Sequence, residues 1–185
     1  MKRLLILIVL VLTGCGDLEP EQAATKQNLI RKIISQVNTS GTITDRQAES
    51  LGKAEDWLYL NGLITITDKQ AESLSKAVRL QLNGLTSITD KQAELLKKVK
   101  TKLFLNGLTT ISDEQAESLG YMPWLELNGV TSITSKQAEM LSHIERLSLT
   151  GLTSITDEQA ESLSKVENLK ISEGLQPLID KYKKQ

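Results

Sequence analysis

From residue 43 onward, apolar and polar positions recur along the chain with a period of 22 or 23 residues. The second of six copies reads ITDKQAESLSKAVRLQLNGLTS over residues 66–87. A period of this length is typical of repeat proteins, in which each copy buries its apolar face against the next. Six copies exceed the roughly three that are needed to bury a continuous core. The pattern therefore predicts a solenoid of six units over residues 43–175.

The first half of each copy predicts a short helix whose start is encoded in the sequence. In the first copy Thr44 is followed three residues later by Gln47, and all six copies have Ser or Thr followed by Gln at these positions. This spacing is that of a capping box, in which the two side chains bond reciprocally to backbone amides at the helix start. Ala48 and Leu51 lie three residues apart, so we expect both to face the core.

The second half of each copy predicts a short strand, because two aliphatic residues flank one variable residue. Side chains alternate between the two faces of a strand, so the aliphatic residues should point inward and the variable residue outward. In five copies Asn-Gly or Thr-Gly follows, and we expect the glycine to supply a positive φ. The predicted strands are residues 58–60, 80–82, 103–105, 125–127, 147–149 and 169–171.

Both ends of the solenoid require caps, because each end would otherwise expose core residues and an unpaired strand. Residues 15–42 should hold a short linker and an N-terminal capping helix over residues 19–37. The alternative is that this helix is amphipathic and lies on a membrane. Residues 176–185 are expected to form the C-terminal cap. The apolar residues at helical spacing in the N-terminal helix are Ile30, Ile33, Ile34 and Val37.

The first 14 residues have the organisation of a signal peptide. Lys2 and Arg3 precede nine unbroken apolar residues, a run well short of the roughly 20 residues of a membrane-spanning helix. The sequence LTGC at residues 12–15 resembles the bacterial lipobox, which implies cleavage before Cys15 and lipidation of that residue. The lipid would anchor the mature protein to the cell membrane or the outer membrane, on the extracytoplasmic side. An ordinary signal peptide followed by a chance cysteine is the alternative.

The strand and turn of each copy follow the pattern L-x-L-N-G-L-T-x-I, which resembles the leucine-rich repeat. The helix start I-x-D-x-Q-A is similar to that of the BspA-like repeats of bacterial surface proteins. The resemblance covers residues 43–175. It implies an α/β fold, a right-handed solenoid with a parallel sheet on its concave face and short helices on its convex face. The family's asparagine, three residues past the second strand leucine, is here replaced by residues such as Leu63, so an internal asparagine ladder is not expected.

Composition excludes several classes of function. Cys15 is the only cysteine and His143 the only histidine, so neither an internal disulfide nor a His/Cys metal site or a Cys–His catalytic pair is available. Loss of Lys2 and Arg3 with the signal peptide changes the net charge from −1 to −3, which offers no basic field for nucleic acid. The repeated serines lack an accompanying base, and the sequence has no glycine-rich phosphate loop. We therefore expect a protein that is not an enzyme, has no cofactor and binds no nucleic acid.

One glutamate recurs on every predicted helix, and the six form a column on the outer side of the solenoid. Stacked carboxylates could bind calcium, but calcium needs about six to eight converging oxygens and one carboxylate per repeat does not converge. The alternative is pairing with a basic residue three positions earlier, which is Arg46, Lys69, Lys91 or Lys136. We expect pairing and no metal site. The column consists of Glu49, Glu72, Glu94, Glu117, Glu139 and Glu161.

The outward positions of the predicted strands form the candidate binding surface. Four of the chain's six aromatic residues fall within the twelve positions that lie before and between the strand aliphatics. Aromatic residues and arginine anchor many interfaces, although strands also favour aromatic residues that simply pack on one another. The candidate residues are Trp57, Tyr59, Arg79, Gln81, Lys102, Phe104, Trp124, Glu126 and Arg146.

These residues predict a binding module with an unidentified partner. The first hypothesis is protein–protein interaction in the cell envelope through the concave sheet. The second is glycan binding, with the aromatic rings as stacking platforms, and the third is a structural spacer without a ligand. From a strand spacing of ~4.8 Å we expect two separate patches about 10–15 Å apart, one at Trp57 and Tyr59 and the other at Lys102, Phe104 and Trp124.

Overall fold

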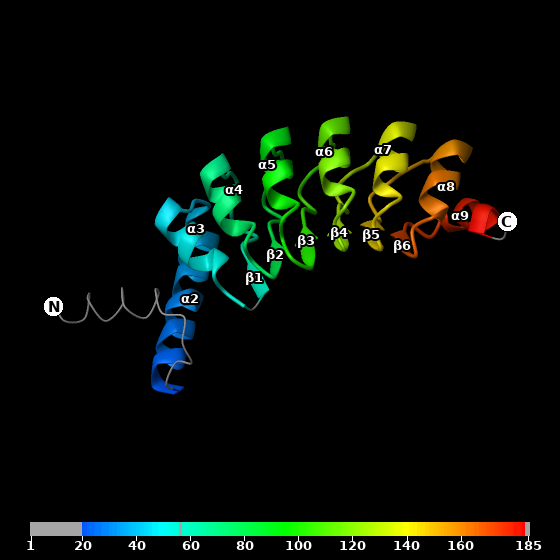
Figure 1. Ribbon diagram of the computed structural model, residues 1–185. Helices are drawn as coiled ribbons and strands as arrows, with labels where there is room; N and C mark the ends of the chain where they lie inside the picture. The colour runs from blue at the N-terminus through cyan, green and yellow to red at the C-terminus, as the bar shows by residue number, and fades with distance from the viewer. Residues whose placement is uncertain (1–19, 56, 184–185) are drawn as a thin grey trace.

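The computed structural model describes residues 20–55 and 57–183. Helices and strands alternate and stack into a curved solenoid, whose strands line the concave side and whose repeat helices line the convex side (Figure 1). The strands are β1 (Trp57–Tyr59), β2 (Arg79–Gln81), β3 (Lys102–Phe104), β4 (Trp124–Glu126), β5 (Arg146–Leu149) and β6 (Asn168–Ile171). The repeat helices are α3 (Asp45–Gly52), α4 (Asp68–Leu74), α5 (Asp90–Leu96), α6 (Asp113–Leu119), α7 (Ser135–Leu141) and α8 (Asp157–Ser164).

The six strands form one parallel sheet in the order β1 to β6. The register is constant, with Leu58 opposite Leu80 and Leu80 opposite Leu103, so equivalent side chains form columns across the sheet. Each strand begins one residue earlier than predicted, because backbone hydrogen bonding rather than the aliphatic pattern delimits a strand. The predicted faces are confirmed, since Leu58 and Leu60 are fully buried and Tyr59 is 48% exposed.

Every repeat helix begins with the predicted capping box. In the third copy the Thr89 hydroxyl accepts from the Gln92 amide (3.1 Å), and Gln92 Oε1 accepts from the Thr89 amide (3.0 Å). Gln92 has a further role that the capping-box spacing does not predict: its Nε2 donates to the carbonyl of Ile66, one repeat earlier (2.8 Å). The same bond joins consecutive repeats at Gln70, Gln115, Gln137 and Gln159.

An asparagine ladder runs along the turns, at a different position from the one at which no ladder was expected. Leu63, at the position where the leucine-rich-repeat pattern that the sequence resembles has asparagine, is fully buried, and the ladder is built by the asparagine that directly follows the second strand aliphatic. Asn83 Oδ1 accepts from the Asn106 amide (3.0 Å), and Asn106 Oδ1 accepts from the Asn128 amide (2.9 Å). The ladder pairs backbone amides that close stacking of the turns removes from water.

The turn glycines are required by the close approach of consecutive repeats. Among the described residues Gly41 alone has a positive φ (71°), so the expectation of a positive φ in the Asn-Gly and Thr-Gly turns was wrong. A Cβ on Gly107 would lie 2.3 Å from the backbone oxygen of Asn83 and 2.4 Å from that of Leu85. Neighbouring turns are therefore too close to admit any other side chain.

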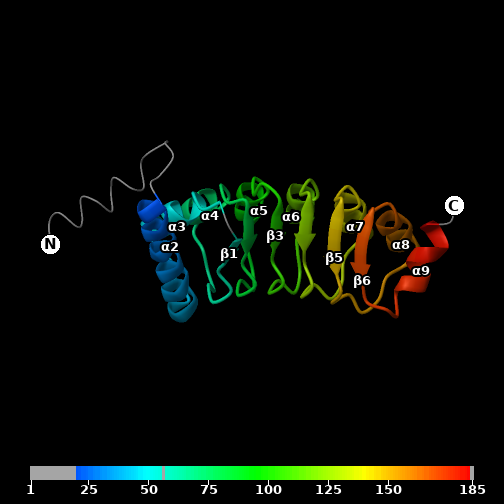
Figure 2. The same ribbon diagram turned by 90° about the horizontal axis from the view of Figure 1, so that it is seen from below.

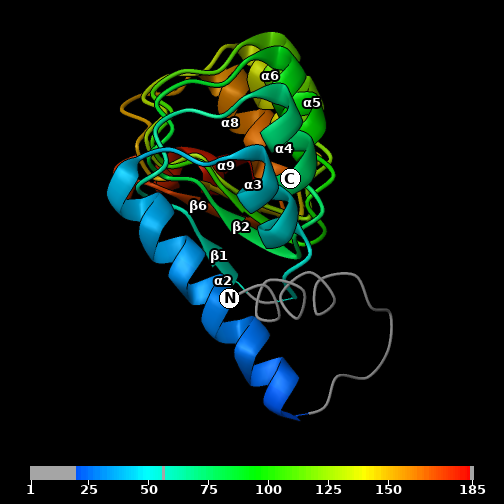
Figure 3. The same cartoon turned by 90° about the vertical axis from the view of Figure 1, so that its left-hand side faces the viewer.

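Helix α2 (Pro20–Ser40) lies across the first repeat and contributes Ile30, Ile33 and Val37 to the core. Figure 3 shows the helix crossing that end of the solenoid beside β1. At the opposite end, α9 (Gln176–Lys183) packs beside α8 (Figure 2). Its Ile179 is fully buried. The core consequently runs without interruption from α2 through the six repeats to α9.

Helix α2 also continues the asparagine ladder. Asn38 Oδ1 accepts from the Gly62 amide (2.9 Å), and Asn38 Nδ2 donates to the Tyr59 carbonyl (2.8 Å). The helix thereby offers the first turn a side-chain amide oxygen, as each asparagine of the ladder does for the next repeat.

Within residues 20–55 and 57–183, no helix combines the length and apolarity that crossing a membrane requires. The predicted signal peptide, residues 1–14, and Cys15 lie outside the described residues.

Candidate functional site

The concave face carries the side chains that the sequence predicted to point outward. Trp57, Arg79, Lys102 and Trp124 are partly exposed, and Arg146 is exposed. In the neighbouring column Tyr59 is exposed and Gln81, Phe104 and Glu126 are partly exposed. Ser148 was also predicted to face outward, but it is buried because its hydroxyl donates to Asn128 Oδ1 (2.7 Å) within the asparagine ladder.

Four rings on this face form one continuous aromatic cluster, which consists of Trp57, Tyr59, Phe104 and Trp124. The ring centroids are 5.4 Å apart for Trp57 and Tyr59, 5.2 Å for Trp57 and Phe104, and 6.1 Å for Phe104 and Trp124. The expectation of two separate patches was wrong. It rested on the backbone spacing of the strands, whereas the long side chains of Trp57 and Phe104 bridge the distance from β1 to β3.

Three cations lie on the rings of the aromatic cluster, and we call Arg79, Lys102 and Arg146 the cationic triad. The Lys102 ammonium is 3.7 Å from the Trp124 ring centroid and 5.4 Å from that of Trp57. The Arg79 guanidinium lies 5.6 Å from the Trp57 ring, and the Arg146 guanidinium 5.3 Å from the Trp124 ring. Such cation–π contacts hold charged groups in position at the surface without neutralising them.

Glu126, the one carboxylate among the candidate residues, forms hydrogen bonds within the protein. Glu126 Oε2 accepts from Asn106 Nδ2 (3.2 Å) and from Asn128 Nδ2 (3.4 Å), which connects it to the asparagine ladder. Arg146 pairs with Glu145 (3.5 Å) where both side chains are at least half exposed. In the part of the chain that the structure describes, Arg79 and Lys102 make no ion pair. Two of the three cations are thus available to an external anion.

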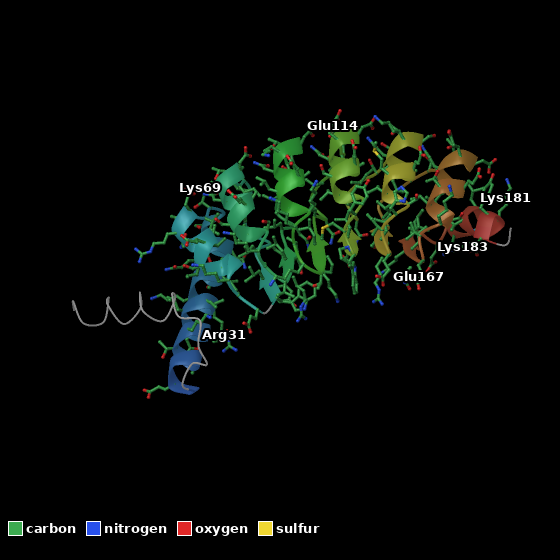
Figure 4. All side chains as sticks on the ribbon, in the orientation of Figure 1. Arg31, Lys69, Glu114, Glu167, Lys181 and Lys183 are labelled. Atoms are coloured by element: carbon green, nitrogen blue, oxygen red, sulfur yellow. The ribbon has the colours of Figure 1, made fainter. Side chains whose placement is uncertain are left out.

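A cleft of about 340 Å³ opens at the β1 end of the aromatic cluster. Its walls come from α2 and from the first repeat, and Trp57 and Tyr59 belong to both the cleft and the cluster. Figure 4 shows Arg31 projecting from α2 on the side of the strands. This cleft was not predicted from the sequence, because the repeat pattern does not determine how α2 lies against β1. The lining residues are Gln27, Ile30, Arg31, Ile34, Ser35, Ala54, Trp57, Leu58 and Tyr59.

The convex face carries ion pairs that differ from the predicted ones. The expected pairing three residues apart occurs for Lys91 and Glu94 (2.9 Å). Lys69 instead reaches Asp45 (2.9 Å), and Lys136 reaches Asp113 (3.2 Å), each one repeat earlier. The lysine holds the pKa of the aspartate below its ordinary value in both pairs.

The remaining two predictions for the convex side concern Arg46 and the glutamate column. Arg46 has no ion pair in residues 20–55 and 57–183, and Glu49 pairs with Lys53 (3.2 Å). The described residues contain no group of three or more His, Cys, Asp or Glu side chains that could hold a metal ion.

His143, the lone histidine, is exposed and stacks on Tyr121, with ring centroids 6.4 Å apart and planes 6° from parallel.

Comparison of the chain with protein-family models, with curated proteins and with solved structures finds no match. The function is therefore inferred from the geometry of the chain itself.

Proposed function

We propose that this protein is a lipid-anchored binding module of the bacterial cell envelope, and that its concave sheet contacts a partner protein. In this proposal the six repeats are leucine-rich repeats wound as a right-handed solenoid. Residues 1–14 are removed as a signal peptide, and lipidated Cys15 attaches the protein to the cell membrane or the outer membrane. The protein acts by binding and catalyses no reaction.

The aromatic cluster and the cationic triad together carry the proposal. Tryptophan, tyrosine and arginine are the residues that most often dominate the binding energy of an interface. Here both tryptophans of the chain lie on one face, in contact with two further rings and three cations. The side chains rise from a sheet of constant register, which fixes them relative to one another before a partner arrives.

Capture of the partner tests the proposal. The full chain and its variants are expressed in the native bacterium, cross-linked and recovered with whatever is bound. Trp57→Ala and Trp124→Ala should each reduce capture, since truncating a true anchor costs ~2 kcal/mol or more of binding free energy. Lys91→Ala and Glu94→Ala, on the convex helix α5, should leave capture unchanged.

Melting curves of the same four variants show whether each change is confined to the surface. Unaltered capture by both tryptophan variants, together with loss in the convex variants, would move the binding surface to the helices. In that case the aromatic cluster would serve only to cover the sheet.

A further inference from the structure

We infer that the segment bound by the concave face is an acidic stretch of polypeptide in extended conformation, which crosses the strands along the cationic triad. This inference rests on the proposed function, because it specifies the chemistry of the partner at the same surface. Three observations carry it: the charge of the face, the occupation of the tryptophan rings, and the line that the cations follow.

In its outward columns the concave face carries more basic than acidic side chains, on a chain whose net charge is −1, and Arg146 is the one cation of the cationic triad that forms an ion pair among the described residues, with Glu145 (3.5 Å). Its outward columns carry Arg79, Lys102, Arg146 and Lys170 against one carboxylate, Glu126. That carboxylate accepts two hydrogen bonds from the asparagine ladder and forms no ion pair within the described residues. The convex helices carry the column of six exposed glutamates. Complementary potentials select partners and suppress wrong ones, so a partner of this face should carry negative charge.

The tryptophan rings are already occupied by groups of this chain. Trp124 on β4 lies between Lys102 on β3 and Arg146 on β5, and both cations stand over its ring. Trp57 carries Arg79 and Lys102, and the Tyr59 ring stacks on it with planes 12° from parallel. A sugar would have to displace these groups before it could stack. An anion would meet the cations where they already are, so the arrangement favours carboxylates over a stacked glycan.

The cations follow a line across the sheet that suits an extended peptide. From Arg79 on β2 to Arg146 on β5 there are three strand spacings, or roughly 14–15 Å. An extended chain advances about 3.3 Å per residue, so four or five residues cover this distance. Arg31 in the cleft beside Trp57 continues the line beyond β1 onto α2. A short segment with acidic side chains at alternate positions would place successive carboxylates toward the face.

Titration with a defined peptide tests the inference on the purified full chain in detergent. The probe is a 12-residue peptide of alternating glutamate and serine, and its matched control has glutamine in place of glutamate. Trp57 and Trp124 are the two tryptophans of the chain, so their fluorescence reports on this face alone. The acidic peptide should change the emission with an affinity that falls as salt is added, because partly exposed ion pairs are screened. The glutamine peptide should have no effect.

Charge variants identify the cations that bind the probe. Arg79→Gln combined with Lys102→Gln should weaken binding about ten-fold or more, since each removes a charge-assisted hydrogen bond. Arg79→Lys should retain most of the affinity because the charge is kept. Lys91→Gln and Lys136→Gln, on the convex helices, are the matched controls and should bind the probe normally. Equal binding of both peptides, no response to the acidic peptide, or equal losses in convex and concave variants would each overturn the inference.

Two further experiments distinguish a failure of this inference from a failure of the proposed function. An oligogalacturonate, which carries carboxylates on a sugar chain, should bind more weakly than the acidic peptide; the reverse order would assign the face to an anionic glycan and overturn the inference. Capture of the native partner is then compared between Lys102→Gln and Trp124→Ala. Loss in both supports the inference. Loss in Trp124→Ala alone would contradict it while leaving the proposed function intact, and loss in neither would contradict both.

Discussion

Gln92 binds two repeats at once through the two ends of its side-chain amide. Its Oε1 accepts from the Thr89 amide at the start of α5, and its Nε2 donates to the Ile66 carbonyl of the preceding repeat. The side chain is buried, so neither bond exchanges freely with water. Gln47, in the first copy, makes the helix cap, but its amide reaches no earlier repeat among the described residues. Gln47 therefore only caps its helix, whereas Gln92 caps its helix and also joins its repeat to the preceding one.

Gln92→Ala should destabilise the protein more than Gln47→Ala. Either substitution removes the hydrogen bond from the N-cap backbone amide to the glutamine side chain, which costs about 0.5–1.5 kcal/mol. Gln92→Ala also leaves the Ile66 carbonyl without its partner, which adds about 1–3 kcal/mol. Urea unfolding of the two variants measures the difference. Equal losses at the two positions would show that the bond between repeats contributes nothing.

Glycine substitutions test whether the turn glycines are required by close packing between repeats or by backbone strain. At Gly107 an added methyl group would meet two backbone oxygens closer than 2.5 Å, whereas at Gly174 it would meet nothing within 4 Å. Gly107→Ala should therefore cost about 1–3 kcal/mol or more, as expected for overpacking against atoms that cannot move aside. Gly174→Ala should change stability by less than about 0.5 kcal/mol. Thermal melts of both variants check this, and similar losses at the two positions would refute the packing explanation.

Two pairs of consecutive repeat helices, α3 with α4 and α6 with α7, are linked by lysine–aspartate pairs that cross from one helix to the next. Lys136 donates to Asp113 and thereby lowers the pKa of that carboxyl below its ordinary value of 3.8. A folded pKa below the unfolded one stabilises the protein at pH values above 3.8, and this stabilisation is lost as the pH falls through the folded pKa. Both side chains are substantially exposed, so the contribution of the pair to stability is small.

Lys136→Gln should raise the pKa of Asp113 toward its ordinary value, because the lysine is the largest cause of the depression. An NMR titration of the Asp113 carboxyl in the full chain measures the shift. Lys91→Gln is the control, since Lys91 pairs with Glu94 on its own helix and should leave Asp113 unaffected. An unchanged Asp113 pKa in Lys136→Gln would show that the pair is not formed in solution.

The secondary structure of each repeat was predictable, because its causes lie within the repeat. Thr89 and Gln92 specify a helix start at a spacing of three, and the alternation around Leu103 and Leu105 specifies which side chains face inward. The errors concern contacts between repeats. Asn106 accepts a hydrogen bond from the next turn, and Lys136 pairs with a residue of the previous helix. Both contacts depend on how consecutive repeats stack, which the pattern within one repeat does not determine.

The candidate surface was predictable as a set of residues but not as an arrangement. All nine predicted residues lie on the concave side of the sheet with at least partial exposure, because strand alternation determines their face. Their grouping into one cluster depends on the length and direction of the side chains of Trp57 and Phe104, which a strand pattern does not contain. The cleft beside Arg31 depends on the position of α2, which is separated from the repeats in sequence.

The two faces of the molecule differ in the charged side chains that they carry. The cationic triad lies on the concave face, and the glutamate column lies on the convex face, where Lys69 and Glu114 project from the helices in Figure 4. Helices α2 and α9 lie at opposite ends of the solenoid, and α2 begins five residues after Cys15 in the sequence. A lipid on Cys15 would therefore hold the solenoid by the end at which the cleft opens.

Cys15→Ser should move the protein from the membrane fraction to the soluble or secreted fraction, because the proposed lipid is its attachment. Mass spectrometry of the mature amino terminus should find an acylated Cys15 in the unaltered protein. Membrane association that persists in Cys15→Ser, or an unmodified terminus at another residue, would contradict the proposed anchor.

Site-specific photo-cross-linking in the native bacterium tests the central claim most directly. A photoreactive residue replaces either Gln81, on the concave face in β2 between β1 and β3, or Glu117, exposed on the convex helix α6. If the concave sheet binds a partner protein, illumination should give a discrete protein adduct from position 81 and none from position 117. An adduct from position 117 alone would contradict the assignment of the binding surface.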